Sequence, residues 1–125
     1  MVINCDKLAK EVSGLYKPEI EKMLGTTDAK QIANIIFSDK KKYRKYTKFL
    51  WNILGLFLKE IIANSKCSTI ILDAPLLLES GIYKICDTVI HFDTKYDLRL
   101  ERAKSRGWTE AELKSRDRFF TKRPA

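Results

Sequence analysis

The sequence predicts an α/β fold in which helices flank a parallel sheet. Two runs rich in β-branched residues, Cys67–Leu72 and Asp87–Phe92, lack the alternation of half-exposed strands and are typical of strands buried on both faces. A shorter apolar run, Val2–Cys5, marks a further strand end. Segments with helical spacing of apolar residues lie before, between and after these runs. Strands that alternate with helices favour a parallel sheet.

The helices follow from cap residues and apolar spacing. Asp6 stands at an N-cap position before a helix that Gly14 stops, and Pro18–Leu24 forms a second helix closed by Gly25. Asp28 opens a third helix, and Ser38 or Asp39 caps a fourth that runs to about Ala63. The second half of the fourth helix is so apolar that it must be buried on most of its circumference or meet a partner. The C-terminal part holds a helix from Thr94 to about Arg106 and a last helix that starts at the capping box Thr109–Glu112.

Length and composition predict a single globular domain spanning residues 1–125. The 125 residues are 45% hydrophobic and 32% charged, which excludes a wholly disordered chain. The longest apolar stretch, Phe49–Leu58, is too short to span a membrane, and a charge at Asp6 argues against a signal peptide. Three widely spaced cysteines predict reduced thiols in a cytoplasmic protein. Zinc is disfavoured by the single histidine, His91, which we expect to be a core or edge residue of its strand.

A formal charge of +8 favours an acidic partner, either nucleic acid or a small phosphorylated ligand. One basic group is Lys40–Lys48, which includes Tyr43 and Tyr46. The other is spread over the C-terminal part: Arg99, Arg102, Lys104, Arg106, Lys114, Arg116, Arg118, Lys122 and Arg123. Trp108, Phe119 and Phe120 could stack on a purine, and ordinary helix packing explains them equally well. Composition alone does not separate the two kinds of partner.

Four stretches occur in an order that resembles the dephospho-coenzyme A kinase family. Val-Ile-Asn-Cys-Asp at residues 2–6 is similar to the strand end of that family, and Ile-Phe-Ser-Asp at 36–39 to its step into a long helix. Asp-Ala-Pro-Leu-Leu-Leu-Glu at 73–79 resembles its most distinctive loop. Residues 87–90, followed by the arginine-bearing segment 98–106, resemble its next strand and helix. The resemblance covers nearly the whole chain.

The resemblance implies a fragment of the nucleoside-monophosphate-kinase-like, or P-loop kinase, fold. The implied reaction is phosphoryl transfer from ATP, with Mg²⁺, to the ribose 3′-hydroxyl of dephospho-coenzyme A. Asp6 would be the catalytic carboxylate that orients or deprotonates this hydroxyl. Arg102 and Arg106, one helical turn apart, would bind phosphate. The acceptor would be bound by Leu8, Pro75, Leu76 and Glu79.

The sequence also departs from the family pattern. No glycine is followed by Lys and then Ser or Thr, so the first strand and the phosphate loop that hold ATP and Mg²⁺ are missing, as is the final strand. Asn4 stands where the family has an aspartate, and Trp51-Asn52 stands near the place of a His-Pro pair. We therefore expect no kinase activity from this polypeptide alone.

Without its central strand the sheet is incomplete. We expect Thr69–Leu72 and Thr88–Phe92 to pair directly, or to leave open edges that a second copy or a companion segment could fill. Two other functions stay open: a non-catalytic scaffold or regulator of the same fold, and a basic nucleic-acid-binding module. Neither implies a membrane.

Overall fold

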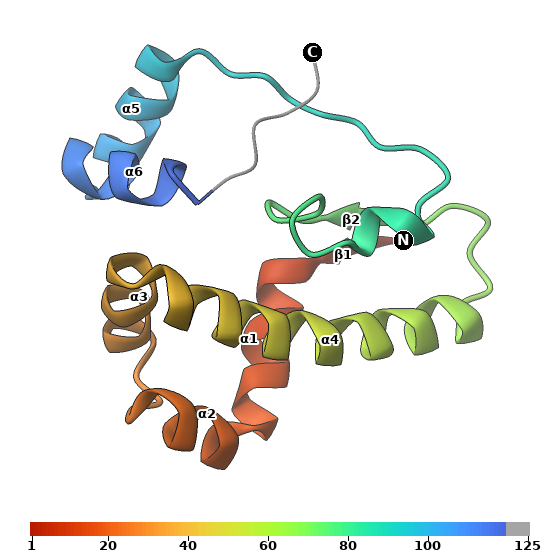
Figure 1. Cartoon of the computed structure of the whole chain (residues 1–125). Coiled ribbons are helices and arrows are strands. Elements are labelled where there is room, and N and C mark those ends of the chain that lie inside the picture. The colour runs from red at the N-terminus through yellow and green to blue at the C-terminus, as the bar shows by residue number, and fades with distance from the viewer. Residues whose placement is uncertain (120–125) are drawn as a thin grey trace.

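The computed structural model of the chain describes residues 1–119. Along the chain the elements are β1 (Val2–Asn4), α1 (Cys5–Leu15), α2 (Lys17–Leu24), α3 (Ala29–Ser38), α4 (Lys40–Asn64), β2 (Ile71–Asp73), the 3₁₀ helix η1 (Ile82–Ile85), α5 (Tyr96–Ser105) and α6 (Glu110–Asp117). Figure 1 shows the strand pair above the crossing of α1 and α4, with α2 and α3 on one side and the α5–α6 pair reached by a long extended segment. Within this range no helix is long and apolar enough to cross a membrane.

β1 and β2 form a parallel pair, which confirms the predicted α/β class. Val2 is in register with Ile71, and Asn4 with Asp73. The amide of Ile71 donates to the carbonyl of Met1 at 2.9 Å, and the N-terminal ammonium donates to the carbonyl of Thr69 at 3.0 Å. The two strands therefore end at the same edge, where the helix α1 begins directly after β1.

Two strand predictions were wrong. β2 begins at Ile71 instead of Cys67, and it is exposed at both ends instead of buried on both faces. Residues 87–92 form no strand and are exposed, His91 and Phe92 included, so His91 is neither a core nor a strand-edge residue. Consequently β2 pairs with β1 and not with residues 88–92. The physical reason is that a strand buried on both faces needs hydrogen-bonded neighbours and covering helices, and within residues 1–119 the sheet has only two strands.

The helix ends follow the sequence, with two corrections. Gly14 does not stop α1, which continues to Leu15. Asp28 and Asp39 cap α3 and α4, Thr109 and Glu112 form the capping box of α6, and Gly25 ends α2 with a left-handed φ of 76°. Asp6, however, is not an N-cap. The cap of α1 is Asn4, whose side chain accepts a hydrogen bond from the Lys7 amide at 3.0 Å, and Asp6 lies in the first turn. Asn is as favourable an N-cap as Asp, so α1 begins two residues earlier than predicted with an equally good cap.

Two hydrophobic clusters lie along α4. The first consists of Cys5, Val12, Leu54, Leu58 and Ile82, and joins α1, α4 and η1 beneath the sheet. The second consists of Ile20, Ile32 and Ile36, with Tyr43, Tyr46 and Phe49 of α4 packed against it. The second half of α4 was predicted to be buried on most of its circumference or to meet a partner: Leu54 and Leu58 are buried and most of its other apolar side chains are half-buried, whereas Leu56 is 68% exposed. One α4 face packs on α1, and the opposite face carries Leu56.

α5 and α6 form a helical hairpin held by polar contacts. Arg99 of α5 donates two hydrogen bonds to the carboxylate of Asp117 of α6, at 2.8 and 3.0 Å. Tyr96 donates to Glu110 at 2.9 Å. The end of α6 reaches α3, because Arg118 donates to the carbonyl of Phe37 at 2.8 Å and the Phe119 ring lies 5.5 Å from that of Phe37. The hairpin is thereby attached to the α3–α4 corner.

Candidate functional site

Two carboxylates lie at the edge where both strands end. Asp73 is the last residue of β2, and Asp6 lies in the first turn of α1, two residues after β1. The parallel register places Asn4 beside Asp73, so the short step from β1 into α1 carries Asp6 to the same edge. Ligands of α/β proteins bind at the carboxyl ends of parallel strands. This edge, with Asp6 and Asp73, is our candidate site.

The Asp6 carboxylate has no structural hydrogen bond that would keep it from a ligand. Asn4 makes the helix cap, and within residues 1–119 no group donates a hydrogen bond to the Asp6 carboxylate. Partial burial raises the pKa of Asp6, and the negative charge of Asp73 raises it further. A carboxylate whose pKa is raised in this way holds a proton more readily than an ordinary aspartate, which suits a group that accepts one.

Cys5 lies beside this pair but is not a reactive thiol. It is fully buried in the first hydrophobic cluster. Burial raises the pKa of Cys5 to about 11, and the charges of Asp6 and Asp73 contribute. The thiol therefore stays protonated at neutral pH and serves as a small core residue. Cys5, Cys67 and Cys86 form no disulfide.

The loop after β2 is a series of turns anchored to the first cluster. Ala74 and Leu77 pack on that cluster, the Ser80 amide donates to the Leu76 carbonyl at 3.0 Å, and the Tyr83 amide donates to the Leu77 carbonyl at 3.3 Å. Pro75 and Glu79 are exposed, and Leu76 is half-buried. Glu79 lies near α4, because its charge adds to burial in raising the pKa of Tyr43. The loop thus extends from the strand ends towards the start of α4.

Comparison of the sequence with known protein families identifies the family of this chain. The family model for dephospho-CoA kinase matches residues 1–119. The chain belongs to the dephospho-CoA kinase family.

Several curated dephospho-CoA kinases are similar to this chain. That of Fusobacterium nucleatum is 32% identical over 122 residues, covering 90% of this chain and 63% of the relative. That of Aquifex aeolicus is 36% identical over 93 residues, covering 74% and 47%. That of Geobacillus kaustophilus is 28% identical over 111 residues, covering 86% and 55%. The chain thus spans about half to two thirds of the length of these relatives.

The remaining candidate residues do not all gather at the strand ends. Leu8 is half-buried and packs on the first cluster, close to Asp6 in α1. Arg102 and Arg106 are exposed on α5 and at its C-cap. Figure 1 shows α5 well apart from β1 and β2. The acceptor-binding role of Leu8, Pro75, Leu76 and Glu79, and the phosphate-binding role of the two arginines, remain predictions.

Sequence reasoning missed two features of the site. Asp73 lies within the loop motif and was not predicted as a site residue, although it ends a strand, where ligands of α/β proteins bind; the parallel pairing places it beside Asn4. The second feature is a pocket between α4 and the end of α6, lined by Lys40, Tyr43, Arg44, Arg118 and Phe119. Its two halves are too far apart in sequence for any spacing to indicate it.

The described residues do not fit bound Mg²⁺ and ATP. Among residues 1–119 no three His, Cys, Asp or Glu side chains gather to hold a metal ion. Nor do the 125 residues contain the Gly-Lys-Ser/Thr sequence whose backbone, ammonium and hydroxyl bind the phosphates and the metal. Two carboxylates are a minimal donor set for Mg²⁺, which needs substrate phosphates as well. The described residues by themselves therefore provide no complete Mg²⁺ site.

Proposed function

We propose that this chain contains the acceptor-binding part of a dephospho-CoA kinase, an enzyme that phosphorylates the 3′-hydroxyl of dephospho-coenzyme A with ATP. The single observation that supports this most is the uncommitted Asp6 carboxylate beside Asp73 at the strand ends. The family membership supplies the substrate class. The fold is then part of the P-loop kinase fold.

Asp6 positions the acceptor in this proposal. Its carboxylate accepts a hydrogen bond from the 3′-hydroxyl and takes the proton as the hydroxyl oxygen bonds to the γ-phosphorus of ATP and the bond from that phosphorus to the leaving ADP breaks. Positioning and electrostatics supply most of the catalysis in phosphoryl transfer. The raised pKa of Asp6 makes it a better proton acceptor than an ordinary aspartate. Asp73 is a positioning residue that sustains this pKa through its own negative charge.

The ATP-binding half comes from a companion segment in this proposal. The resemblance places a strand and phosphate loop between β2 and residues 87–92. β2 has an edge that carries no strand within residues 1–119, and Ile90 and Phe92 are 76% and 82% exposed. An open edge and exposed apolar side chains are what an added strand covers. Without that segment the 125 residues do not catalyse phosphoryl transfer.

The contacts favour this function over nucleic-acid binding. Two arginines that would form a C-terminal basic stripe are engaged inside the protein: Arg99 with Asp117, and Arg116 over the Trp108 ring at 3.8 Å. Phe119 packs against Phe37 instead of presenting a stacking surface. Lys122, Arg123 and Phe120 lie outside the described residues. A phosphate backbone would meet fewer available cations than the composition suggests.

Calorimetric titration of the purified chain with dephospho-coenzyme A tests the proposal. We expect binding that Asp6→Asn weakens by roughly tenfold, the loss of one charge-assisted hydrogen bond. Titration with ATP and Mg²⁺ should give no binding that depends on Asp6. The matched control is Glu11→Gln, which removes an exposed carboxylate from the same helix and should leave the affinity unchanged. Silence with dephospho-coenzyme A from a folded sample, or equal losses in both variants, would reject the acceptor site.

A further inference from the structure

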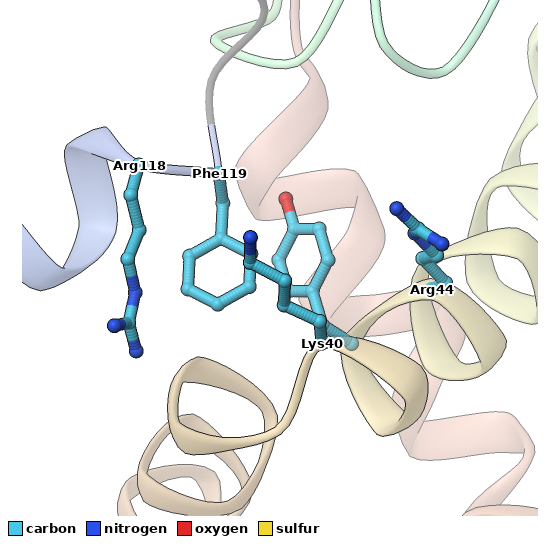
Figure 2. A pocket seen from close by; sticks show the side chains of 5 residues that line it. Lys40, Arg44, Arg118 and Phe119 are labelled. Carbon is cyan, nitrogen blue, oxygen red and sulfur yellow. The ribbon is translucent and has the colours of Figure 1, made fainter.

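A small pocket lies between the start of α4 and the end of α6. Its volume is about 150 Å³, and it is lined by Lys40, Tyr43, Arg44, Arg118 and Phe119. Figure 2 shows Lys40 and Arg44 on α4 and Arg118 and Phe119 at the end of α6, with the Phe119 ring between Arg118 and Arg44 in this view. Pockets for whole drug-sized ligands measure ~300–1,000 Å³. This pocket therefore has room for one small group of a ligand and not for a complete nucleotide.

The pocket is strongly and uniformly cationic. Three of its five lining residues carry a positive charge and none carries a negative one. Within residues 1–119 neither Lys40 nor Arg44 forms an ion pair, whereas Arg99 and Lys114 each have a carboxylate partner. A bound anion would interact favourably with all three of these cations.

The cationic side chains, and not the helix end, would hold this anion. Asp39 occupies the amides at the start of α4, because its carboxylate accepts from the Lys41 and Lys42 amides at 2.9 and 3.2 Å. Arg118 is held in place by its hydrogen bond to the Phe37 carbonyl at 2.8 Å. A guanidinium retains several further N–H donors when one is engaged. Arg118 is thus a positioned donor at the rim of the pocket.

An aromatic wall backs the three cations. The rings of Tyr43 and Phe119 lie 4.5 Å apart between centroids, and Phe37 packs against both, at 5.8 Å from Tyr43 and 5.5 Å from Phe119. Tyr43 is half-buried. Apolar surface beside a charged group excludes water and strengthens its interaction with an anion.

We propose that Lys40, Arg44 and Arg118 bind a phosphate or diphosphate group of a ligand whose organic part extends out of the pocket. The chemistry fits an oxyanion, since guanidinium groups donate paired hydrogen bonds to phosphate oxygens and lysine adds a point charge. The identity of the ligand rests on the proposed function: dephospho-coenzyme A carries a diphosphate between its adenosine and its pantetheine. The pocket would hold this diphosphate while the loop after β2 contacts the remainder.

Titrations with three phosphate compounds and one matched pair of variants test the pocket. Inorganic pyrophosphate, ADP and dephospho-coenzyme A are each titrated into the wild type, into Lys40→Ala with Arg44→Ala, and into Lys41→Ala with Lys45→Ala. Both double variants remove two charges one turn apart from the same helix, and only the first touches the pocket. We expect the pocket variant to weaken pyrophosphate roughly tenfold to a hundredfold and the control variant to change it less than twofold. Circular dichroism establishes that both variants fold, and Lys40→Gln with Arg44→Gln replaces the alanine pair if it does not.

The outcomes separate this inference from the proposed function. Equal losses in both double variants, or none in either, would overturn the pocket. If the pocket variant binds dephospho-coenzyme A as the wild type does while Asp6→Asn does not, the pocket fails and the proposed function stands. If pyrophosphate depends on Lys40 and Arg44 while dephospho-coenzyme A does not bind at all, the pocket stands and the proposed function fails. Stronger dependence for ADP than for dephospho-coenzyme A would identify the group as a nucleotide phosphate instead of the acceptor diphosphate.

Discussion

At the scale of single residues, the role of Asp6 depends on its neighbour Asn4. An aspartate at a helix start is most often a cap, and a capping carboxylate is tied to backbone amides. Here Asn4 accepts from the Lys7 amide, which leaves the Asp6 carboxylate exposed to a ligand and to the charge of Asp73. The departure of position 4 from the family aspartate therefore has a local function in this chain: it caps α1.

The raised pKa of Asp6 predicts how stability depends on pH. Because folding raises this pKa, the folded chain binds the Asp6 proton more tightly than the unfolded chain does. The contribution of Asp6 to stability is therefore greatest below its unfolded pKa and decreases as the pH rises through the folded pKa. Asp6→Asn abolishes this decrease. We expect the free energy of unfolding of Asp6→Asn, relative to wild type, to rise between pH 3 and pH 7 in urea titrations. The same rise in Glu11→Gln would contradict the interaction of Asp6 with Asp73.

At the scale of elements, α4 organises the chain. Its first half lines the cationic pocket and the second hydrophobic cluster, and its second half buries Leu54 and Leu58 against α1. Its start was predictable, because Asp39 precedes a helix-forming run, and the structure confirms Asp39 as the cap. Its burial was not predictable, since the apolar composition of a helix does not say which neighbours cover it.

Removal of the α4 cap should destabilise the protein measurably. Asp39→Ala loses the hydrogen bonds from the amides of Lys41 and Lys42, and we expect a loss of about 1 kcal/mol in the free energy of unfolding. Asp39→Asn retains a capping oxygen and should lose much less. Urea denaturation followed by circular dichroism measures both. Equal destabilisation by Ala and Asn would mean that the charge of Asp39, and not its cap geometry, stabilises α4.

At the scale of the whole molecule, length predicts a single domain. Whether α5 and α6 belong to it depends on how they are attached to the rest of the chain. The extended segment before α5 contributes no strand, so attachment depends on the contacts of the α6 end with Phe37 and Tyr43. These contacts join residues more than 70 positions apart in the sequence. We propose that they make residues 1–119 unfold as one unit.

The two tryptophans can test this proposal. Trp51 packs on the first cluster, and Trp108 lies under the Arg116 guanidinium in the α5–α6 hairpin. In Trp108→Phe the fluorescence reports the first region, and in Trp51→Phe it reports the hairpin. We expect the urea transition of each variant, seen by fluorescence, to coincide with its own transition seen by circular dichroism. A hairpin signal that melts at lower urea than the helical signal of the same variant would divide the chain into two units.

The sequence by itself determined the helices, the class of the fold and the family resemblance. Caps such as Asp28, Asp39 and Thr109 and the stop at Gly25 act within one helical turn, so local sequence contains the whole cause. Tertiary structure alone decided the rest. Strand pairing needs a partner distant in sequence, which is why Ile71–Asp73 became a strand beside β1 while residues 87–92 did not. The position of Asp73 at the same edge as Asp6, and the packing of Phe119 on Tyr43, likewise depend on which distant segments pack together. The spacing of residues along the chain does not indicate such long-range contacts.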